Sequence, residues 1–461
     1  MYVRQHSHPS GGSVLAAVCL AAALAPGTSA AWQQMHKLLP DDGGAWRGFG
    51  ARVVLTGDLA FVGSPGAGAD ETDSGSVYVF NAVTGEQLAN FAADDAQAAD
   101  MFGGAIAIDG DLAVIGAGGH DDPELDCGAA YVFDVSDPAN PLQLRKLTPN
   151  NANIDDYFGS AVAIEGTLAV IGAPYKADAA GVAYIFDVTT GEQLHQLMRD
   201  DPAVGDVFGL PVAISGESVL AGAYGDDDAG DDSGSVYVFD TATGQQLCKF
   251  LADDTAAVDR FGQYFSMEGH IVLVSAFMDD DAGENSGSAY LFDLTDPTQP
   301  LQLTKLIGDG VGPDDRFGGG VCICGDVAII AAWNDDDAAP DAGAAYTFDV
   351  SDPQNPVQLA KLTADDAEQD ELFGQESVAI DGELALVGVR CDDDLGQASG
   401  SAYIFQAIQC PADFDGDGDV DTADLLYLLA AWGTPDGDVD ADGDTDTADL
   451  LALLSAWGPC R

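Results

Sequence analysis

Basic residues are scarce in this 461-residue chain, which has 15 lysines and arginines against 78 aspartates and glutamates. A formal net charge of −63 at pH 7 repels nucleic acid and anionic membranes and favours multivalent cations. Hydrophobic residues still make up 47% of the chain, which is enough to build a core and excludes a disordered acidic tail. The charge alone is equally compatible with a surface adapted to solubility or to salty water.

Histidine is also rare, and this limits the catalytic chemistry that the chain can carry. Beyond residue 30 the histidines are His36, His120, His195 and His270, and none lies in a local pattern typical of a metal site or a catalytic triad. Carboxylates are abundant enough to leave an acid/base pair for glycoside cleavage open, but no one pair stands out. We therefore predict no catalytic residue.

Long apolar runs are confined to the N-terminus. Arg4, the apolar run from Val14 to Leu24 and the small residues up to Ala30 predict an export signal over residues 1–30. Its removal takes Arg4 away and leaves 14 basic residues, so the net charge becomes 14 − 78 = −64. No later segment has the ~20 apolar residues that a membrane span needs. We expect a secreted protein, either extracellular or attached to the cell surface.

The dipeptide Phe-Gly begins seven copies of one pattern that recur every 50 to 56 residues. The copies start at Phe49, Phe102, Phe158, Phe208, Phe261, Phe317 and Phe373. Each has four alternating apolar runs separated by turns, which in the second copy predicts strands at 102–108, 112–117, 129–135 and 142–147. Four strands in ~50 residues are typical of a propeller blade. Residues 31–406 are therefore predicted to form an all-β, seven-bladed propeller.

The stretch "QMHKLLPDD" at residues 34–42 resembles the fourth strand of a copy, whereas the seventh copy stops after its third strand at Phe405. Pairing the two completes the last blade and removes an open sheet edge. Residues 31–40 are therefore predicted to be the closing strand of blade seven, with residues 32–39 bonded to residues 401–406.

The Phe-Gly starts, "IGAP" at 171–174 and "SGSVYVF" at 74–80 and 233–239 resemble bacterial FG-GAP repeats, relatives of the integrin alpha-subunit propeller. The resemblance covers about Trp32 to Gln406 and implies the fold rather than an activity. Integrin-type blades often hold calcium between their first two strands, but here that connection is a tight turn, so those ligands are not carried over.

Acidic triplets follow the second strand instead, at 226–228, 279–281, 335–337 and 392–394. They are either weak cation sites or a solvated acidic rim, because three adjacent Asp side chains cannot all face one ion. Aromatic residues in the same region, Tyr224, Phe277 and Trp333 with Tyr175 one position on, either stack on glycan rings or pack against the next blade.

After Cys410 the pattern changes to two acidic loops, each followed by a Leu-rich helical segment. In both loops the oxygen donors fall at positions one, three, five, seven, nine and twelve, with Gly418 or Gly443 at position six, which is typical of a calcium loop. The predicted Ca²⁺ ligands are Asp413, Asp415, Asp417, Asp419 (carbonyl), Asp421 and Asp424 in the first loop, and Asp438, Asp440, Asp442, Asp444 (carbonyl), Asp446 and Asp449 in the second. We expect two Ca²⁺ ions and a small all-α module over residues 410–461.

Asp at position twelve and a single helix after each loop make this segment similar to a type I dockerin, whose family role is to dock onto cohesins. The resemblance implies partner contacts at Thr422, Ala423, Thr447 and Ala448. The repeats are only 25 residues apart, so the partner is either a cohesin-like or another cell-surface protein. Leu425, Leu426, Leu428, Leu429 and Trp432, and their equivalents 25 residues on, predict one packed apolar stripe per helix.

Cys410 and Cys460 flank the module, and in an exported protein we predict that they form a disulfide. The pairing of Cys127, Cys248, Cys322, Cys324 and Cys391 stays open, although an odd number implies at least one free thiol. We expect a binding or adhesion propeller, with a possible glycan or protein ligand, that is docked through its calcium module. The alternatives are a dockerin-borne carbohydrate-active enzyme, which requires an unpaired carboxylate in the central channel, and a structural surface-assembly protein.

Overall fold

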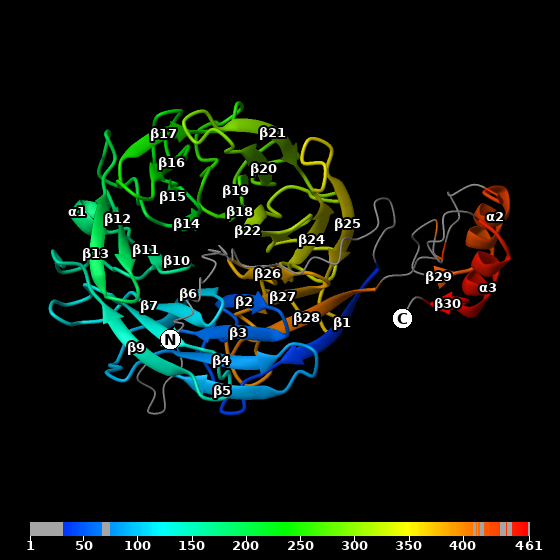
Figure 1. The fold of residues 1–461 in the computed structure, drawn as a ribbon, viewed down its shortest axis with the longest axis horizontal. Helices are drawn as coiled ribbons and strands as arrows, with labels where there is room; N and C mark the ends of the chain where they lie inside the picture. The colour runs from blue at the N-terminus through cyan, green and yellow to red at the C-terminus, as the bar shows by residue number, and fades with distance from the viewer. Residues whose placement is uncertain are drawn as a thin grey trace, which may run out of the picture.

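The computed structural model describes residues 31–66, 74–408, 419–433 and 445–459, together with positions 412, 414 and 439. Residues 31–408 form seven four-stranded antiparallel sheets arranged around a ring (Figure 1). The predicted all-β, seven-bladed propeller is confirmed. The export signal predicted for residues 1–30 lies outside the described residues.

The first strands of neighbouring blades contact one another, so they form the inner wall of the ring, and the fourth strands lie on the outside. Blades one and two contain β2 (Arg52–Thr56), β3 (Leu59–Ser64), β4 (Ser76–Asn81), β5 (Gln87–Phe91), β6 (Phe102–Asp109), β7 (Leu112–Ala117), β8 (Ala129–Asp134) and β9 (Leu142–Leu147). Blades three and four contain β10 (Ala161–Glu165), β11 (Leu168–Ala173), β12 (Val182–Asp187), β13 (Glu192–Leu197), β14 (Val212–Ser215), β15 (Ser218–Ala223), β16 (Ser235–Asp240) and β17 (Gln246–Phe250). Blades five and six contain β18 (Phe265–Glu268), β19 (Ile271–Ala276), β20 (Ser288–Asp293), β21 (Leu301–Leu306), β22 (Phe317–Cys324), β23 (Val327–Ala332), β24 (Ala344–Asp349) and β25 (Val357–Leu362). A short α1 (Lys176–Ala179) lies in blade three and includes left-handed residues.

Blade seven closes the ring with strands from both ends of the propeller. It contains β26 (Val378–Asp381), β27 (Leu384–Val389), β28 (Ser401–Ile408) and β1 (Ala31–Leu38). β1 pairs antiparallel with β28, from Ala31 opposite Ile408 to Leu38 opposite Ala402. The predicted closing strand is therefore confirmed.

Phe-Gly links each blade to the one before it. The backbone N–H of Phe102, for example, donates to the carbonyl of Ser74 at 3.0 Å, and Phe102 forms a parallel bridge with Gly75. A Cβ on Gly75 would lie 2.1 Å from the carbonyl oxygen of Phe102, so only glycine permits this approach. Most first strands begin after the dipeptide and not at it, as β10 does at Ala161. The prediction that the strand starts at Phe-Gly holds only for β6 and β22.

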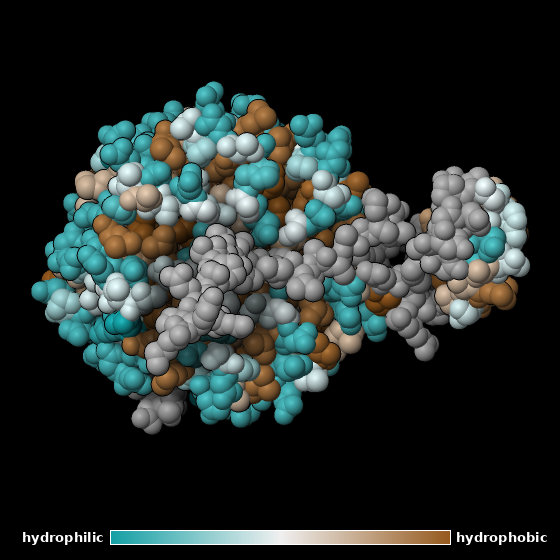
Figure 2. All heavy atoms as spheres, viewed as in Figure 1, coloured by the Kyte–Doolittle hydropathy of each residue, from teal (hydrophilic) through white to brown (hydrophobic). Residues whose placement is uncertain are grey.

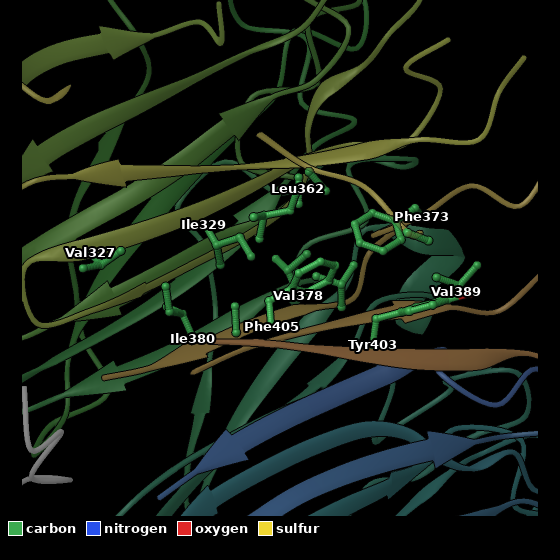
Figure 3. Close-up of a cluster of buried hydrophobic side chains, with 14 of the residues drawn as sticks. Val327, Ile329, Leu362, Phe373, Val378, Ile380, Val389, Tyr403 and Phe405 are labelled. Atoms are coloured by element: carbon green, nitrogen blue, oxygen red, sulfur yellow. The ribbon is translucent and has the colours of Figure 1, made fainter. Parts of the chain in front are cut away.

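The hydrophobic core is divided into layers between neighbouring blades. Figure 3 shows the layer between blades six and seven, where Ile329 and Leu362 face Phe373, Tyr403 and Phe405. An equivalent layer joins blades seven and one, since Leu38 and Phe49 pack in the same cluster as Leu386 and Ile404. Hydrophilic residues gather around the rim of the ring (Figure 2).

The described C-terminal elements are β29 (Asp419–Val420), α2 (Thr422–Ala430), α3 (Thr447–Ser455) and β30 (Gly458–Pro459). They lie to one side of the propeller in Figure 1. Among the described residues, no helix combines the length and the apolar character that crossing a bilayer requires.

Candidate binding and metal sites

The acidic triplets bind lysine side chains of their own blades. In blade five, Lys305 Nζ from β21 lies 2.9 Å from Asp254 Oδ2, 2.9 Å from Asp279 Oδ2 and 2.5 Å from Asp281 Oδ2. These three carboxylates are close enough to one another to hold a metal ion. The ammonium group already occupies the place between them, so the cluster is neutralised by the protein itself.

The same lysine–carboxylate cluster recurs in three other blades, built around Lys37, Lys249 and Lys361. In each, the first Asp of the triplet is buried, and it also contacts the hydroxyl of a buried Tyr on the third strand. The four buried aspartates are Asp226, Asp279, Asp335 and Asp392. The interpretation of the triplets as a solvated rim is therefore wrong for their first residues, although the second and third stay exposed or partly exposed.

Burial and charge act in opposite directions in these clusters. Burial disfavours the charge on Lys305, but hydrogen bonds to Asp254, Asp281 and Tyr290 outweigh it and raise the pKa of Lys305 above its ordinary value. Lys305 in turn outweighs burial at Asp254 and lowers the pKa of that carboxyl. All six lysines of the chain contact an Asp carboxylate in this way or in a related one. A lysine recurs at one position of the fourth strand in most copies, and this recurrence is the feature of the sequence from which the network could have been predicted.

A second buried acid recurs two residues before Phe-Gly in blades two to seven, and it accepts a backbone N–H from its own loop. These acids are Asp100, Asp156, Asp206, Asp259, Asp315 and Glu371. The first three contact His120, Lys176 and Arg199 respectively. Among the described residues, no basic side chain lies within 4 Å of the other three carboxylates. Burial raises their pKa values to about 6 for Asp259, about 6 for Asp315 and about 7 for Glu371.

The central channel contains a cavity of about 200 Å³ lined by the first strands of all seven blades. Its one lining carboxylate, Glu376, lies 3.2 Å from the guanidinium of Arg52, which also donates to the carbonyl of Glu376 at 2.7 Å. Burial would raise the pKa of Glu376, but the charges of Arg52 and Arg390 outweigh burial and hold it below its ordinary value. Among the residues lining this cavity, the unpaired carboxylate that the enzyme alternative requires is absent.

The aromatic residues singled out in the sequence behave in different ways. Phe277 is buried and packs on Tyr264, with 5.9 Å between the ring centroids. Tyr224 and Trp333 are partly exposed, and each ring is covered by a guanidinium, from Arg260 at 5.8 Å and from Arg316 at 4.5 Å. Tyr175 is exposed and packs edge-on against Tyr157. Of the two alternatives, glycan stacking and packing within the protein, these contacts favour packing, because each of the four rings has an aromatic or arginine partner.

Five of the twelve predicted calcium ligands lie in the part of the chain that the structure describes. Asp413, Asp415, Asp417, Asp438, Asp440, Asp442 and Asp444 lie outside the described residues, as do Cys410 and Cys460. Asp419 lies in β29, which pairs with β30 at the end of the second half. Asp421, Asp424, Asp446 and Asp449 lie at the starts of α2 and α3.

The two position-twelve residues, Asp424 and Asp449, are fully buried and have the same geometry in both halves. Asp424 accepts the N–H of Asp421 at 2.7 Å and the N–H of Phe414 at 2.6 Å. Asp449 accepts the N–H of Asp446 at 2.6 Å and the N–H of Val439 at 2.7 Å. Each oxygen of a carboxylate has two lone pairs, so these bonds are compatible with a cation on the same oxygens.

Asp421 and Asp446 are the N-caps of α2 and α3, and each forms a capping box with the buried Asp three residues on. The residues implied as partner contacts, Thr422, Ala423, Thr447 and Ala448, are exposed in the first turn of each helix.

The apolar stripe predicted for each helix is divided between two faces. Leu428 and Leu453 are buried, with Leu425 and Leu450 packed against them. Six other apolar side chains of the two helices and their ends are 45–65% exposed: Leu426, Leu429, Trp432, Leu451, Leu454 and Trp457. The prediction of a single packed stripe is therefore wrong, because apolar residues one position apart on a helix face different directions.

Four of the five remaining propeller cysteines are free thiols: Cys127, Cys248, Cys322 and Cys391. Cys127 is buried among apolar residues, where burial raises its pKa. Cys324 is disulfide-bonded. The expectation of at least one free thiol is confirmed.

The FG-GAP repeat model matches the chain at residues 32–80, 86–133, 142–186, 192–239, 245–292, 301–348 and 356–405. Each match begins on the outer strand of one blade and ends on the third strand of the next, so the repeat of the sequence is offset by one strand from the blade. β1 is thus the first strand of the first repeat. A comparison with curated proteins found no match. Because the seven matches cover more than half of the chain, the chain belongs to the FG-GAP repeat family.

Proposed function

We propose that this chain is a secreted, calcium-binding propeller that binds extracellular partners, and that residues 410–461 form a dockerin-like module that docks it onto a partner protein or the cell surface. The observation that carries the proposal is the duplication of the buried carboxylate at position twelve, Asp424 and Asp449, in two acidic loops of matching pattern. Position twelve is the place from which a carboxylate side chain completes the oxygen cage of a calcium loop.

The residues that would hold calcium are the twelve aspartates named above, with Asp419 and Asp444 contributing carbonyl oxygens. Calcium supplies positive charge that joins six to eight oxygens in one cage, and its binding free energy stabilises the fold of a small module. The described core around Leu428 and Leu453 is small, which supports this dependence on metal.

The exposed apolar side chains provide the surface for docking. Leu426, Leu429 and Trp432 on one half correspond to Leu451, Leu454 and Trp457 on the other, beside the exposed Thr422-Ala423 and Thr447-Ala448 pairs. A partly exposed Trp is typical of an interface centre, and the two Leu beside it add apolar area. Two such faces of the same composition favour a folded partner protein that can use either half.

Calorimetric titration and partner capture test the proposal. The chain is expected to bind two Ca²⁺ ions, and it is expected to retain a protein from the secretome of its source in calcium but not in chelator. Replacing both buried acids, Asp424→Asn with Asp449→Asn, should abolish both results, whereas Asp58→Asn, an exposed acid of the propeller, should change neither. Binding of no calcium by the unmodified chain would refute the proposal.

An enzymatic role has less support, because the channel carboxylate Glu376 is paired with Arg52. The absence of a calcium-dependent partner, together with calcium-dependent growth in particle size, would favour the structural surface-assembly alternative.

A further inference from the structure

Three arginines without a carboxylate partner lie at one end of the propeller channel. The lysines are all in contact with Asp, and Arg47, Arg52 and Arg199 each have a carboxylate partner. Among the described residues, the arginines with no carboxylate oxygen within 4 Å are Arg145, Arg260, Arg316 and Arg390, although the chain has 78 acidic residues. Arg145 lies apart on the outer strand β9, whereas the other three gather at the channel.

These arginines lie on one face of the ring. Arg390 directly follows β27, and Arg260 and Arg316 directly precede Phe-Gly of blades five and six. In an antiparallel pair the first strand begins where the second strand ends, so all three positions are at the same end of their blades. We call Tyr224, Arg260, Arg316, Trp333 and Arg390 the mouth cluster.

The mouth cluster adjoins the channel cavity. Glu376, which lines the cavity, is close enough to Arg390 for that charge to lower its pKa, and its N–H donates to the carbonyl of Gly319 at 2.8 Å. Trp333 packs directly over Gly319, since a Cβ there would lie 1.8 Å from its ring. Arg316 lies over Trp333 in turn, and Arg260 over Tyr224.

The backbone holds the two stacked arginines in a rarely populated conformation. Arg260 has φ 54° and Arg316 has φ 59°, both in the left-handed region that disfavours side chains other than Gly, Asn and Asp. Stacking on an aromatic ring leaves the edge of a guanidinium open to accept a bidentate anion. The residue before Phe-Gly has this conformation in the other blades as well, as at Met101 and Tyr157, so it is the stacking on Tyr224 and Trp333 that restricts the two guanidinium groups.

Several polar atoms here are buried without a hydrogen-bond partner among the described residues. They are the Nε atoms of Arg260 and Arg316, the side-chain carbonyl oxygens of Gln263, Asn334 and Gln375, and the hydroxyl of Ser377. Gln263 Nε2 donates to the hydroxyl of Tyr264 at 3.2 Å, which leaves its carbonyl oxygen as an acceptor. A ligand that matches this set must carry an anion for the guanidinium groups and hydroxyl donors for the amide oxygens.

We infer that the mouth cluster and the channel cavity bind one carboxylate-bearing sugar residue, a uronate, within a short oligosaccharide. This deepens, and rests on, the extracellular binding role proposed for the propeller. A uronate supplies the carboxylate for Arg260 and Arg316 and hydroxyl groups for the amide oxygens, while Tyr224 and Trp333 hold the two guanidinium groups in place. The cavity of about 200 Å³ is smaller than the ~300 Å³ at which sites for drug-sized ligands begin, so it fits one ring and not a long segment.

The net charge of −63 also selects for a short ligand. Long polyuronates carry many carboxylates that the acidic surface repels, whereas a trimer places only two further charges outside the cavity. An acidic peptide offers carboxylates but few hydroxyl donors, so it leaves the amide oxygens without partners.

The test is calorimetry on the full chain, in chelator, with trigalacturonate, neutral galactotriose and triglutamate as ligands. We expect binding of trigalacturonate alone. The double variant Arg260→Gln with Arg316→Gln should weaken it by about 100-fold or more, because each lost charge-assisted bond costs about tenfold in affinity. The matched control is Arg145→Gln, a surface arginine of β9 that also has no carboxylate partner, and it should change the affinity less than about twofold.

If the double variant does not fold, Arg316→Lys keeps the charge but loses the planar stack on Trp333, and it should still weaken binding several-fold. The inference is overturned by no binding of trigalacturonate, by equal binding of galactotriose or triglutamate, or by unchanged affinity in a folded double variant. Chelator removes the calcium-dependent docking of residues 410–461, so failure here and failure of the proposed docking are separate results.

Discussion

The buried acids before Phe-Gly occupy the same position in different blades, and replacing them by Asn is expected to stabilise the propeller in one blade and to destabilise it in another. Asp259 in blade five and Asp206 in blade four occupy the same place, and each accepts a backbone N–H from its loop, from Ala256 at 2.6 Å and from Ala203 at 2.8 Å. Only Asp206 has a buried cation, since its Oδ2 lies 2.6 Å from NH1 of Arg199. We expect Asp259→Asn to stabilise the propeller at pH 7.5 and Asp206→Asn to destabilise it.

The magnitude follows from the causes of the pKa shift at Asp259. Burial first, and then the charge of Asp279, raise this pKa from 3.8 to about 6, against the opposing bond from Ala256. Two pKa units correspond to about 3 kcal/mol, and solvent relaxation reduces this to about 1–2 kcal/mol. Asn keeps the acceptor for Ala256 and removes the charge. At ~2.1 cal/mol/K per residue over ~375 residues, this raises Tm by about 1–3 °C.

Asp206→Asn leaves the guanidinium of Arg199 buried without its carboxylate, which costs about 3 kcal/mol or more. Asp226 lies 3.9 Å away and compensates only in part. The expected Tm is therefore about 4 °C lower than that of the unmodified protein.

The pH dependence of the stability gained by Asp259→Asn tests whether the buried charge is the cause. The carboxyl of Asp259 has a higher pKa in the folded protein than its ordinary value. Above about pH 6 it is charged in the folded protein, so the unmodified protein then loses the full amount of folding stability that this buried charge costs. Between about pH 6 and pH 4 the folded protein binds a proton that the unfolded chain lacks, and the advantage of Asn shrinks. Differential scanning calorimetry at pH 4 to 8 measures this. A gain that is constant over the range, or a shift of the same sign in both variants, would refute the reasoning.

Three further changes test the fold and its charge network. Deleting residues 31–40 removes β1 and exposes the edge of β28, so Tm should fall and size-exclusion chromatography should show aggregates; an unchanged monomer would contradict ring closure. Lys305→Ala leaves three carboxylates facing one another and should lower the free energy of unfolding by about 3 kcal/mol. In a thermal scan, millimolar Ca²⁺ should restore part of this loss in the variant, whereas it should not raise the propeller transition of the unmodified protein. Gly75→Ala, which would meet the next blade, should lower Tm far more than Gly57→Ala, a positive-φ turn with nothing within 4 Å, and equal losses would show that strain and not the clash decides.

Sequence periodicity predicted the propeller well because its signals are local. Alternating apolar residues and the turn at Asp109-Gly110 place β6 and β7 almost to the residue, and the strand at 112–117 matches β7 completely. The repeat also explains the closing strand, since residues 34–42 carry the same lysine and acidic pair as the end of the sixth copy. Because the same pattern occurs seven times, its copies can be aligned with one another, and an incomplete copy is recognised by comparison with the others.

The acidic loops were harder to interpret, because their role depends on contacts across a blade. Asp279 looks like a surface residue beside Asp280 and Asp281, yet it is 4% exposed and bonded to Lys305, which is 26 residues away on a different strand. Similarly, Leu428 and Leu429 are adjacent and equally apolar, but only Leu428 is buried. Composition identifies the residue types, whereas strand pairing and helix orientation decide which of them meet.

The few lysine side chains of this acidic protein have a structural role. Each lysine joins acidic side chains of neighbouring segments within the propeller, so a large part of the basic residue supply is used to hold loops onto their blades. The remaining surface is then almost uniformly negative, and this strengthens the contrast with Arg260, Arg316 and Arg390. A positive site within a negative surface excludes large polyanions while it retains a small anion that reaches the channel mouth. Selectivity for ligand size would thus come from the charge imbalance of the whole chain.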